Sequence, residues 1–481
     1  MRSWTAGLLV FCTSAAVLVL EIIAGRLVAP HLGVSLETYT GIIGTVLAGI
    51  ALGSAVGGRL ADRYDARRLL GPTLVLGGLL ALTSLPVVTA VGPTVAGGGP
   101  GAIVLLTVLA FFAPAAVLSG VSPMAAKLRL ESLVETGSVV GGLSAAGTAG
   151  ALVGTFLTGF VLVGALPSRA IVVALGLGLL VAGFVLWLVM APARRVVMAG
   201  AAVVAVLVAG VSTSAAGPCH HETAYFCARV ELDPGRPSGR VLVLDDLRHS
   251  YVDLDDPTHL EFRYIRLFAD VIDATTAGPI EVLHVGGGGF TMPRWLAATR
   301  PGSASTVLEL DADLVDIVRD ELGLVTGPDL RVVTGDARTA LDDLPADRFD
   351  VVVGDAFGGV SVPWHLTTVE VVRLLDRVLR PDGVYVLNVI DGGPRRFLRA
   401  EVATLQAVFD HVAVIEPPGQ DGSAPQNHVL VASHAPLTLA QGDLDVAEGL
   451  LADGADLDVL VGGARVLTDG FAPVDQLISR R

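Results

Sequence analysis

Two stretches in the second half of the chain combine glycines and acidic residues in a way that suits nucleoside binding. The run EVLHVGGGG at 281–289 is typical of a strand that ends in consecutive glycines, which let a ligand approach the backbone closely. Further along the chain, the candidate strand STVLEL is followed by Asp311 and carries Glu309 at its end. An acid at this place can accept hydrogen bonds from ribose hydroxyls. The spacing therefore predicts chemistry on a nucleoside-bearing molecule.

Strand and helix patterns alternate from residue 276 onward, which is typical of a parallel sheet with helices on both faces. The candidate strands are EVLHV, STVLEL, RVVTGD, FDVVVGD, GVYVLNV, VAVIE and HVLVAS. Ligands of such sheets collect at the carboxyl ends of the strands. The residues at those ends are Gly286, Gly287, Gly288, Glu309, Asp311, Asp336, Ala337 and Asp355. We expect a Rossmann-like domain at 276–481, preceded by a small antiparallel β-domain at 217–275.

Residues 1–216 contain repeated apolar stretches, each close to the roughly 20 residues that a helix needs to cross a bilayer. They cover about 7–28, 38–58, 69–92, 101–121, 138–165, 169–191 and 196–216. We expect a multi-pass bundle of about seven helices in the cell membrane, with the lipid bilayer as its partner. The stretch at 138–165 is rich in small residues, which indicates close packing between helices. Glu21 and Arg26, both inside the first stretch, are expected to pair with each other.

The basic residues of this half predict its orientation, because Lys and Arg are retained on the cytoplasmic side. They follow the second, fourth and sixth stretches, at Arg59, Arg63, Arg67, Arg68, Lys127, Arg129, Arg194 and Arg195. The amino terminus with Arg2 is then inside, and a seventh crossing would deliver the C-terminal domain outside the cytoplasm. Cys219 and Cys227 can form a disulfide in an oxidising compartment, but we expect two free thiols.

The charge of the second half limits its partners. From residue 217 onward the sequence has 21 Lys or Arg against 41 Asp or Glu. Such an acidic balance without a basic stripe argues against a nucleic-acid partner and suits a cationic substrate. No cluster of residues has the spacing of metal ligands, so no metal is expected.

The glycine turn, Glu309, Asp336 with Ala337, and Asp355 follow one another as in a known family. The chain resembles the polyamine aminopropyltransferases, or spermidine synthases, in the form that is fused to a membrane domain. The resemblance covers roughly 220–440 and implies transfer of an aminopropyl group from decarboxylated S-adenosylmethionine, a co-substrate, to putrescine, with no permanently bound cofactor. It implies that Glu309 holds the ribose, that Asp336 and the Ala337 backbone read the adenine, and that Asp355 is the catalytic base. Substrate contacts implied by position are Tyr225, Tyr264 and His249, and a homodimer is the usual assembly. His365, which follows the Asp355 loop, is a further candidate substrate contact.

Two departures from the family pattern leave other functions open. Gly289 stands where the family has an aspartate that binds the donor amine, and the second acid of the catalytic loop is replaced by glycine at Gly358. An enzyme outside the cytoplasm with Asp355 acting on amines without a donor, as in cyclisation of an N-terminal glutamine, is one alternative. The segment 57–68, GGRLADRYDARR, resembles a loop signature of major facilitator transporters. A transporter or sensor with a pseudoenzyme domain that only binds polyamine or nucleoside is therefore another. The C-terminal tail DGFAPVDQLISRR at 469–481 has no role in any of these interpretations.

Overall fold

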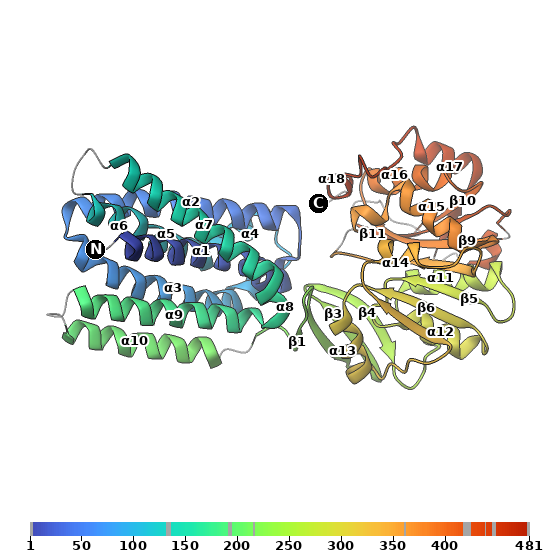
Figure 1. Ribbon diagram of the computed structural model, residues 1–481. Coiled ribbons are helices and arrows are strands. Elements are labelled where there is room, and N and C mark those ends of the chain that lie inside the picture. The colour runs from blue at the N-terminus through green and yellow to red at the C-terminus, as the bar shows by residue number, and fades with distance from the viewer. Residues whose placement is uncertain are drawn as a thin grey trace. The chain divides into compact units, whose positions relative to one another are not determined.

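The computed structural model describes residues 3–130, 136–190, 195–214, 217–359, 362–416, 425–437, 439–444 and 449–478. The chain divides into two compact units, Met1–Cys227 and Ala228–Arg481, which are described in turn (Figure 1). Arg2 and Arg194, used above to predict orientation, lie outside the described residues, as do the tail residues 479–481.

Unit 1 is a helical bundle, and in its described residues six helical stretches are long and apolar enough to cross a membrane. They are α1 (Ser3–Leu32), α2 (Leu36–Arg63), α3 (Ala66–Val95), the stretch Pro100–Arg129, the stretch Thr136–Ala165, and α9 (Ser168–Met190). Pro100–Arg129 comprises α4 (Pro100–Thr107), the π-helical turn η1 (Val108–Phe112), α5 (Ala113–Ser119) and α6 (Val121–Arg129). Thr136–Ala165 comprises α7 (Thr136–Leu157), the π-helical turn η3 (Thr158–Leu162) and α8 (Val163–Ala165). The predicted class, a multi-pass helical bundle followed by an α/β domain, is confirmed.

The seventh predicted crossing corresponds to α10 (Arg195–Ser214), which is also helical. Its described apolar part, Ala199–Ser212, is shorter than the six long helices. This helix packs against α3 and α9, because the Ser212 hydroxyl donates to the Leu82 carbonyl at 2.8 Å and Arg169 donates to the Ser212 carbonyl at 2.7 Å. A seventh crossing stays a prediction.

Close helix packing by small residues, predicted for 138–165, is present on one face of α7. A Cβ atom at Gly150 would lie 2.1 Å from the Phe11 carbonyl oxygen, and one at Gly154 would lie 2.6 Å from that of Ala15. Glycine therefore lets α7 and α1 pack backbone to backbone. On another face of α7, a Cβ atom at Gly142 would meet nothing within 4 Å.

The predicted pairing of Glu21 with Arg26 is wrong. Arg26 instead reaches a later segment: its Nε lies 3.2 Å from Ser168 Oγ and 3.3 Å from Glu222 Oε1, and its other nitrogens donate to the Thr223 and Ala224 carbonyls. Residues five apart are not neighbours on a helix surface, where contacts fall at three and four residues. The partner of Arg26 thus lies 196 residues away in sequence.

Segment 57–68 carries helix-end interactions. Asp62 accepts from Lys127 at 2.9 Å, and Asp65 caps α3 by accepting from the Arg67 backbone N–H at 3.0 Å. The basic ends of α2 and α6 therefore meet at one end of the bundle. The opposite end holds the last turns of α1 and the first residue of α9.

The expectation of free thiols at Cys219 and Cys227 is also wrong, because these residues form a disulfide. The chain between them, which includes the short strand β1 (His221–Glu222), turns back on itself. The Thr223 hydroxyl oxygen accepts from the backbone N–H groups of Tyr225 and Phe226 at 3.1 and 2.9 Å. This turn brings the two cysteine Cα atoms to 5.1 Å, within the range that a disulfide needs.

Unit 2 contains the predicted antiparallel β-strands and the Rossmann-like sheet. The strands β2 (Cys227–Asp233), β3 (Arg236–Leu244) and β4 (Leu247–Asp253) pair antiparallel, with Pro234 and Gly235 in the turn between the first two. The larger sheet contains β5 (Glu281–Val285), β6 (Ala304–Glu309), β7 (Leu330–Thr334), β8 (Phe349–Gly354), β9 (Leu379–Asp391), β10 (His411–Glu416), β11 (Gln426–Ser433) and β12 (Leu450–Ala452). Its order in the described residues is β12-β10-β11-β9-β8-β5-β6-β7.

This sheet is mixed, whereas the sequence predicted parallel strands throughout. Strands β7, β6, β5, β8 and β9 are parallel, but β11 pairs antiparallel with both β9 and β10. The reason is the length of the connection, since residues 417–425 are too few for the crossover of about a dozen residues that parallel neighbours need.

Alternate residues of the central strands bury two different cores. Val351 and Val353 of β8 face a core with α11 and α12, whereas Val352 faces a core with α14, α15, α16 and α17. The helices are α11 (Arg263–Thr275), α12 (Thr291–Thr299), α13 (Ala312–Leu322), α14 (Ala337–Asp342), α15 (Val369–Val378), α16 (Arg396–Gln406), α17 (Gly454–Val461) and α18 (Val474–Leu477). The short 3-10 helices are η5 (Trp364–Leu366) and η6 (Gln441–Asp443).

We expect Gly150→Leu to destabilise unit 1, because the new side chain must push α7 away from the α1 backbone. Overpacking of this kind costs about 1–3 kcal/mol. Gly142→Leu, on an open face of the same helix, is the matched control. Thermal unfolding of both variants in detergent checks the expectation, and equal midpoints for the two would contradict the packing described here.

Candidate active site

The candidate site lies where β5 and β8, two adjacent parallel strands, end side by side. The chain order of the sheet reverses between these strands, and open α/β sheets bind ligands in the crevice at such a point. Gly286 has a positive φ of 97°, and a Cβ atom there would lie 2.5 Å from the Asp355 carbonyl oxygen. Glycine is therefore required for the turn after β5 to approach the Asp355 loop.

Asp355 presents a partly buried carboxylate held by two neutral groups. Tyr264, in the first turn of α11, donates to one oxygen at 3.1 Å, and Asn388 of β9 donates to the other at 2.9 Å. Burial raises the pKa of Asp355 to about 6, and the two hydrogen bonds oppose that rise. The pKa of Tyr264 is raised well above its ordinary value by burial and by the charge of Asp355. A carboxylate of this kind is suited to accept a proton near neutral pH.

Asn388 and Asn427 form a chain behind Asp355 that was not predicted from the sequence. The Asn427 side-chain amide donates to the Asn388 side-chain oxygen at 2.9 Å, which leaves the Asn388 N–H groups facing Asp355. A signal was present in the sequence, because Asn388 is a single polar residue within the apolar strand GVYVLNVI. Buried polar groups are normally hydrogen-bonded, and Asn388 is only 1% exposed.

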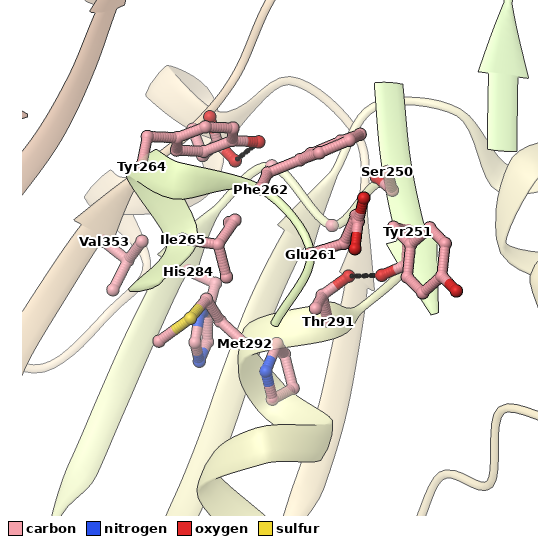
Figure 2. A pocket seen from close by; sticks show the side chains of 14 residues that line it. Ser250, Tyr251, Glu261, Phe262, Tyr264, Ile265, His284, Thr291, Met292 and Val353 are labelled. Carbon is pink, nitrogen blue, oxygen red and sulfur yellow. Dashed lines mark hydrogen bonds between the residues drawn. The ribbon is translucent and has the colours of Figure 1, made fainter. Parts of the chain in front are cut away.

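A cavity of about 30 Å³ opens beside Asp355 (Figure 2). Its walls include Tyr264, Ser250, His284, Glu261 and the glycine turn. Burial lowers the pKa of His284 to about 3, so its imidazole is neutral, and its Nε2 lies 3.2 Å from Ser305 Oγ. A volume of this size is enough for water.

Glu309 supports the glycine turn from below. One carboxylate oxygen accepts from the Gly287 N–H at 2.8 Å, and the other accepts from the Asp311 N–H at 2.9 Å. Burial raises the pKa of Glu309, and these backbone donors oppose that rise. Asp311 itself caps α13 by accepting from two backbone N–H groups of its first turn. Both acids thus shape the turn and the following helix.

The outer side of the turn is covered by β4. The Gly289 N–H donates to Ser250 Oγ at 3.0 Å, and a Cβ atom at Gly288 would lie 3.1 Å from the His249 ring. Burial lowers the pKa of His249 to about 4, so this imidazole is also neutral. Phe290 follows with a φ of 58° and a fully buried ring that packs beside Gly287.

Asp336 and His365 form a second polar pair. Asp336 caps α14 by accepting from the Thr339 N–H at 3.1 Å, and its other oxygen lies 3.0 Å from His365 Nε2. Ala337 is the first residue of α14. None of these residues lines the Asp355 cavity.

The structure therefore places some of the predicted site residues around one cavity, and others lie away from it. Asp355, Tyr264, Gly286 and Gly287 line one cavity. Gly288, Glu309 and His249 contact the same turn. Tyr225 belongs to unit 1, where its side chain is 48% exposed, and its substrate contact stays a prediction.

Comparisons with known proteins identify relatives of the C-terminal unit. Residues 261–391 match the family described as "Spermine/spermidine synthase domain". A polyamine aminopropyltransferase of Vibrio vulnificus is 28% identical over 233 residues, which cover 44% of this chain and 76% of the relative. One of Neisseria meningitidis is 25% identical over 178 residues, which cover 36% of this chain and 65% of the relative. The crystal structure of a probable spermidine synthase from Corynebacterium glutamicum is 30% identical, with a TM-score of 0.48 and coverage of 52% of this chain and 95% of that one.

The family match includes Tyr264, the glycine turn, Glu309, Asp336, Asp355 and Asn388. The resemblance first seen in the motifs is confirmed. Through its C-terminal unit, the chain belongs to the spermidine synthase family of polyamine aminopropyltransferase enzymes.

Proposed function

We propose that unit 2 transfers an aminopropyl group from decarboxylated S-adenosylmethionine to putrescine or a related amine. The observation that carries the proposal is the Asp355 carboxylate, with a pKa raised to about 6, beside the glycine turn. An alkyl amine is protonated in neutral water, with a pKa of roughly 10, and has no free lone pair. Asp355 accepts the proton and so creates the nucleophile.

The transfer of the aminopropyl group then needs no further reagent. The amine lone pair forms a bond to the carbon beside the sulfonium, and the carbon–sulfur electrons pass to sulfur. Methylthioadenosine leaves as a neutral thioether, and the proton remains on Asp355. His249 and His284 are neutral, so they add no positive charge that would repel the cationic substrates.

The remaining roles follow the family pattern. On the donor side we assign the ribose to Glu309 and Asp311, the adenine edge to Asp336 and the Ala337 backbone, and close backbone approach to Gly286, Gly287 and Gly288. On the acceptor side we assign Tyr264 and His249, with Tyr225 and His365 as further contacts. A homodimer is part of this proposal through the family resemblance alone.

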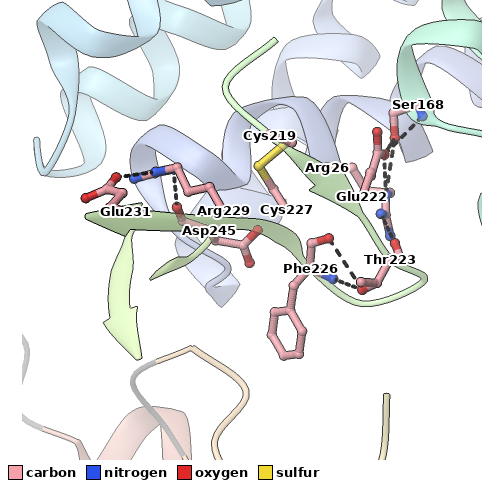
Figure 3. Close-up of a disulfide and its surroundings, with 10 residues drawn as sticks. All are labelled: Arg26, Ser168, Cys219, Glu222, Thr223, Phe226, Cys227, Arg229, Glu231 and Asp245. Carbon is pink, nitrogen blue, oxygen red and sulfur yellow. Dashed lines mark hydrogen bonds and ion pairs between the residues drawn. A yellow bond between two sulfur atoms is a disulfide. The ribbon is translucent and has the colours of Figure 1, made fainter. Parts of the chain in front are cut away.

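We further infer that unit 2 lies outside the cytoplasm. The segment that leads out of unit 1 is bonded to Arg26 and Ser168, at the end of the bundle opposite the basic residues near Asp62 (Figure 3). The Cys219–Cys227 disulfide lies in this same segment, and disulfides persist in oxidising compartments. The contacts of Glu222 with Arg26 and Ser168 identify the end of the bundle at which the chain leaves, whatever the number of helices.

At that location the first candidate function would need an adenosyl donor outside the cytoplasm, whereas a second candidate function needs no donor. Asp355 would then serve amine chemistry without a donor on exported molecules, such as cyclisation of an N-terminal glutamine. The base takes a proton from the α-ammonium group, the amine attacks the side-chain amide carbonyl, and ammonia leaves. The same base and the same cavity serve both reactions.

We expect Asp355→Asn to lower turnover by about 10²- to 10⁴-fold, the usual contribution of a general base. Methylthioadenosine release from decarboxylated S-adenosylmethionine and putrescine measures the first candidate, and ammonia release from glutamine-initiated peptides measures the second. The matched control is Asp350→Asn, at a carboxylate that binds Arg380 and the Glu281 backbone within the same unit. Activity of the Asp355→Asn variant equal to that of wild type would refute the role of the base.

The plot of kcat/KM against pH should show one limb, a fall on the acidic side. A base acts only when deprotonated, so kcat/KM should fall about tenfold per pH unit below pH about 6. Asn388→Ala removes a donor that stabilises the charged carboxylate, so the limb should move to higher pH. A profile that keeps its midpoint while its height falls would show that Asn388 serves the fold alone.

Reporter fusions after residue 481 test the location. We expect alkaline phosphatase, which needs export, to be active there, and green fluorescent protein to be dark. The Cys219→Ser/Cys227→Ser double variant should keep that orientation but lower the midpoint of thermal unfolding. A fluorescent C-terminal fusion would place the enzyme beside the cytosolic donor and exclude the second candidate.

A further inference from the structure

A second cavity in unit 2, of about 250 Å³, shares no lining residue with the Asp355 cavity. It lies between the first turns of α16 and the segment that follows α17. Three arginines line it, Arg396, Arg399 and Arg465, and no acidic residue among those described does. Its volume is several times the roughly 30 Å³ that one water occupies in the liquid.

The charge of the cavity is unusual for its surroundings. The sequence from residue 217 onward is strongly acidic, with 41 Asp or Glu against 21 Lys or Arg. Among the described residues, however, no carboxylate forms an ion pair with Arg396, Arg399 or Arg465, whereas Arg338, Arg348, Arg380 and Arg395 all have one. Three guanidinium groups that have no counter-charge among the described residues favour a ligand with more than one negative charge.

Arg399 is fixed in place by the turn that ends α17. Its Nε and Nη2 donate to the Val461 carbonyl at 3.3 and 3.2 Å, which leaves its other N–H groups available. Gly462 has a φ of 49°, and a Cβ atom there would lie 2.7 Å from Arg399 Nη2. Glycine at this position leaves room for the guanidinium beside the backbone.

The residues of the opposite wall of the cavity are also fixed by contacts with their neighbours. The guanidinium of Arg465 lies over the Phe471 ring, 3.8 Å from its centroid, which fixes the cation by its attraction to the ring face. Leu467 is fully buried, its N–H donates to Thr404 Oγ1, and its carbonyl accepts from the Val369 N–H. The Asp469 carboxylate accepts from Arg338 and Thr368, which fixes the turn that carries Phe471. The tail motif that begins at Asp469 thus builds one side of this cavity.

We propose that the cavity formed by Arg396, Arg399 and Arg465 binds a phosphate group. Planar guanidinium groups match phosphate oxygens in pairs, and arginine is the preferred residue for that recognition. Ala400, Leu467, Phe471 and Leu477 add an apolar lining, so the cavity also accommodates a hydrocarbon part of the ligand. A free phosphate ester and the headgroup of an anionic lipid share this chemistry. The proposal is independent of the reaction at Asp355.

Calorimetric titration of inorganic phosphate into the full-length protein, held in nanodiscs of neutral lipid, tests the proposal. We expect saturable binding that Arg396→Gln and Arg465→Gln each weaken about tenfold or more, as loss of a charge-assisted hydrogen bond does. These two arginines make no hydrogen bond to the described backbone, so we expect both variants to fold, and thermal unfolding of each variant checks this. Arg373→Gln, at an exposed arginine of α15, is the control and should bind like wild type.

Native mass spectrometry of protein extracted from phosphatidylglycerol nanodiscs separates the two sources of phosphate. Lipid retained by wild type and lost in Arg465→Gln would identify a headgroup, and phosphate binding without such retention would identify a soluble ligand. The proposal is overturned if wild type neither binds inorganic phosphate nor retains lipid in a manner that depends on these arginines. It is equally overturned if Arg373→Gln has the same effect as Arg465→Gln.

Discussion

The candidate site depends on one physical constraint. Among the described residues, the carboxylate of Asp355 has no cationic partner. Asp355 is withdrawn from water, and among the described residues its hydrogen-bond partners are the neutral groups of Tyr264 and Asn388. An arginine in either place would lower the pKa of Asp355 and make it a poor base. Five elements supply this environment, because Tyr264 is on α11, Asn388 on β9, Asn427 on β11, and the backbone contacts come from the ends of β5 and β8. The fold of the sheet and the strength of the base are therefore linked.

The histidines near the cavity also carry no positive charge. His249 and His284 are kept neutral by burial, while Glu261 stands at the rim of the cavity. Asp355 and Glu261 both line the cavity, and such carboxylates suit a substrate that arrives as a cation and leaves a proton behind. The arginine cavity of the same unit has the opposite character, so our two proposals give one acidic domain two sites for ligands of opposite charge.

Local sequence patterns were sufficient for the parts of the protein that depend on local physics. Apolar length predicted the long helices of unit 1. The strand ends predicted that Asp355, Glu309 and the glycine turn lie close together, because parallel strands bring their carboxyl ends together wherever they lie in the sequence. Long-range pairing was not predictable in this way. Arg26 and Glu222 meet only because α1 and the segment after α10 end at the same side of the bundle. The antiparallel position of β11, and with it the contact of Asn427 with Asn388, likewise follows from the whole sheet and not from the strand that carries it.

Phe290 has a further consequence for ligand binding. A residue with a side chain at φ 58° raises the energy of the backbone by roughly 1–2 kcal/mol relative to glycine, yet here its ring is fully buried beside the turn. The ring, Ser250 and Glu309 together hold the turn in one conformation before any ligand is present. A turn made of mobile glycines would lose conformational entropy on closing around a ligand. In this protein that entropy is already lost during folding, so a ligand bound at the turn would meet a preorganised backbone.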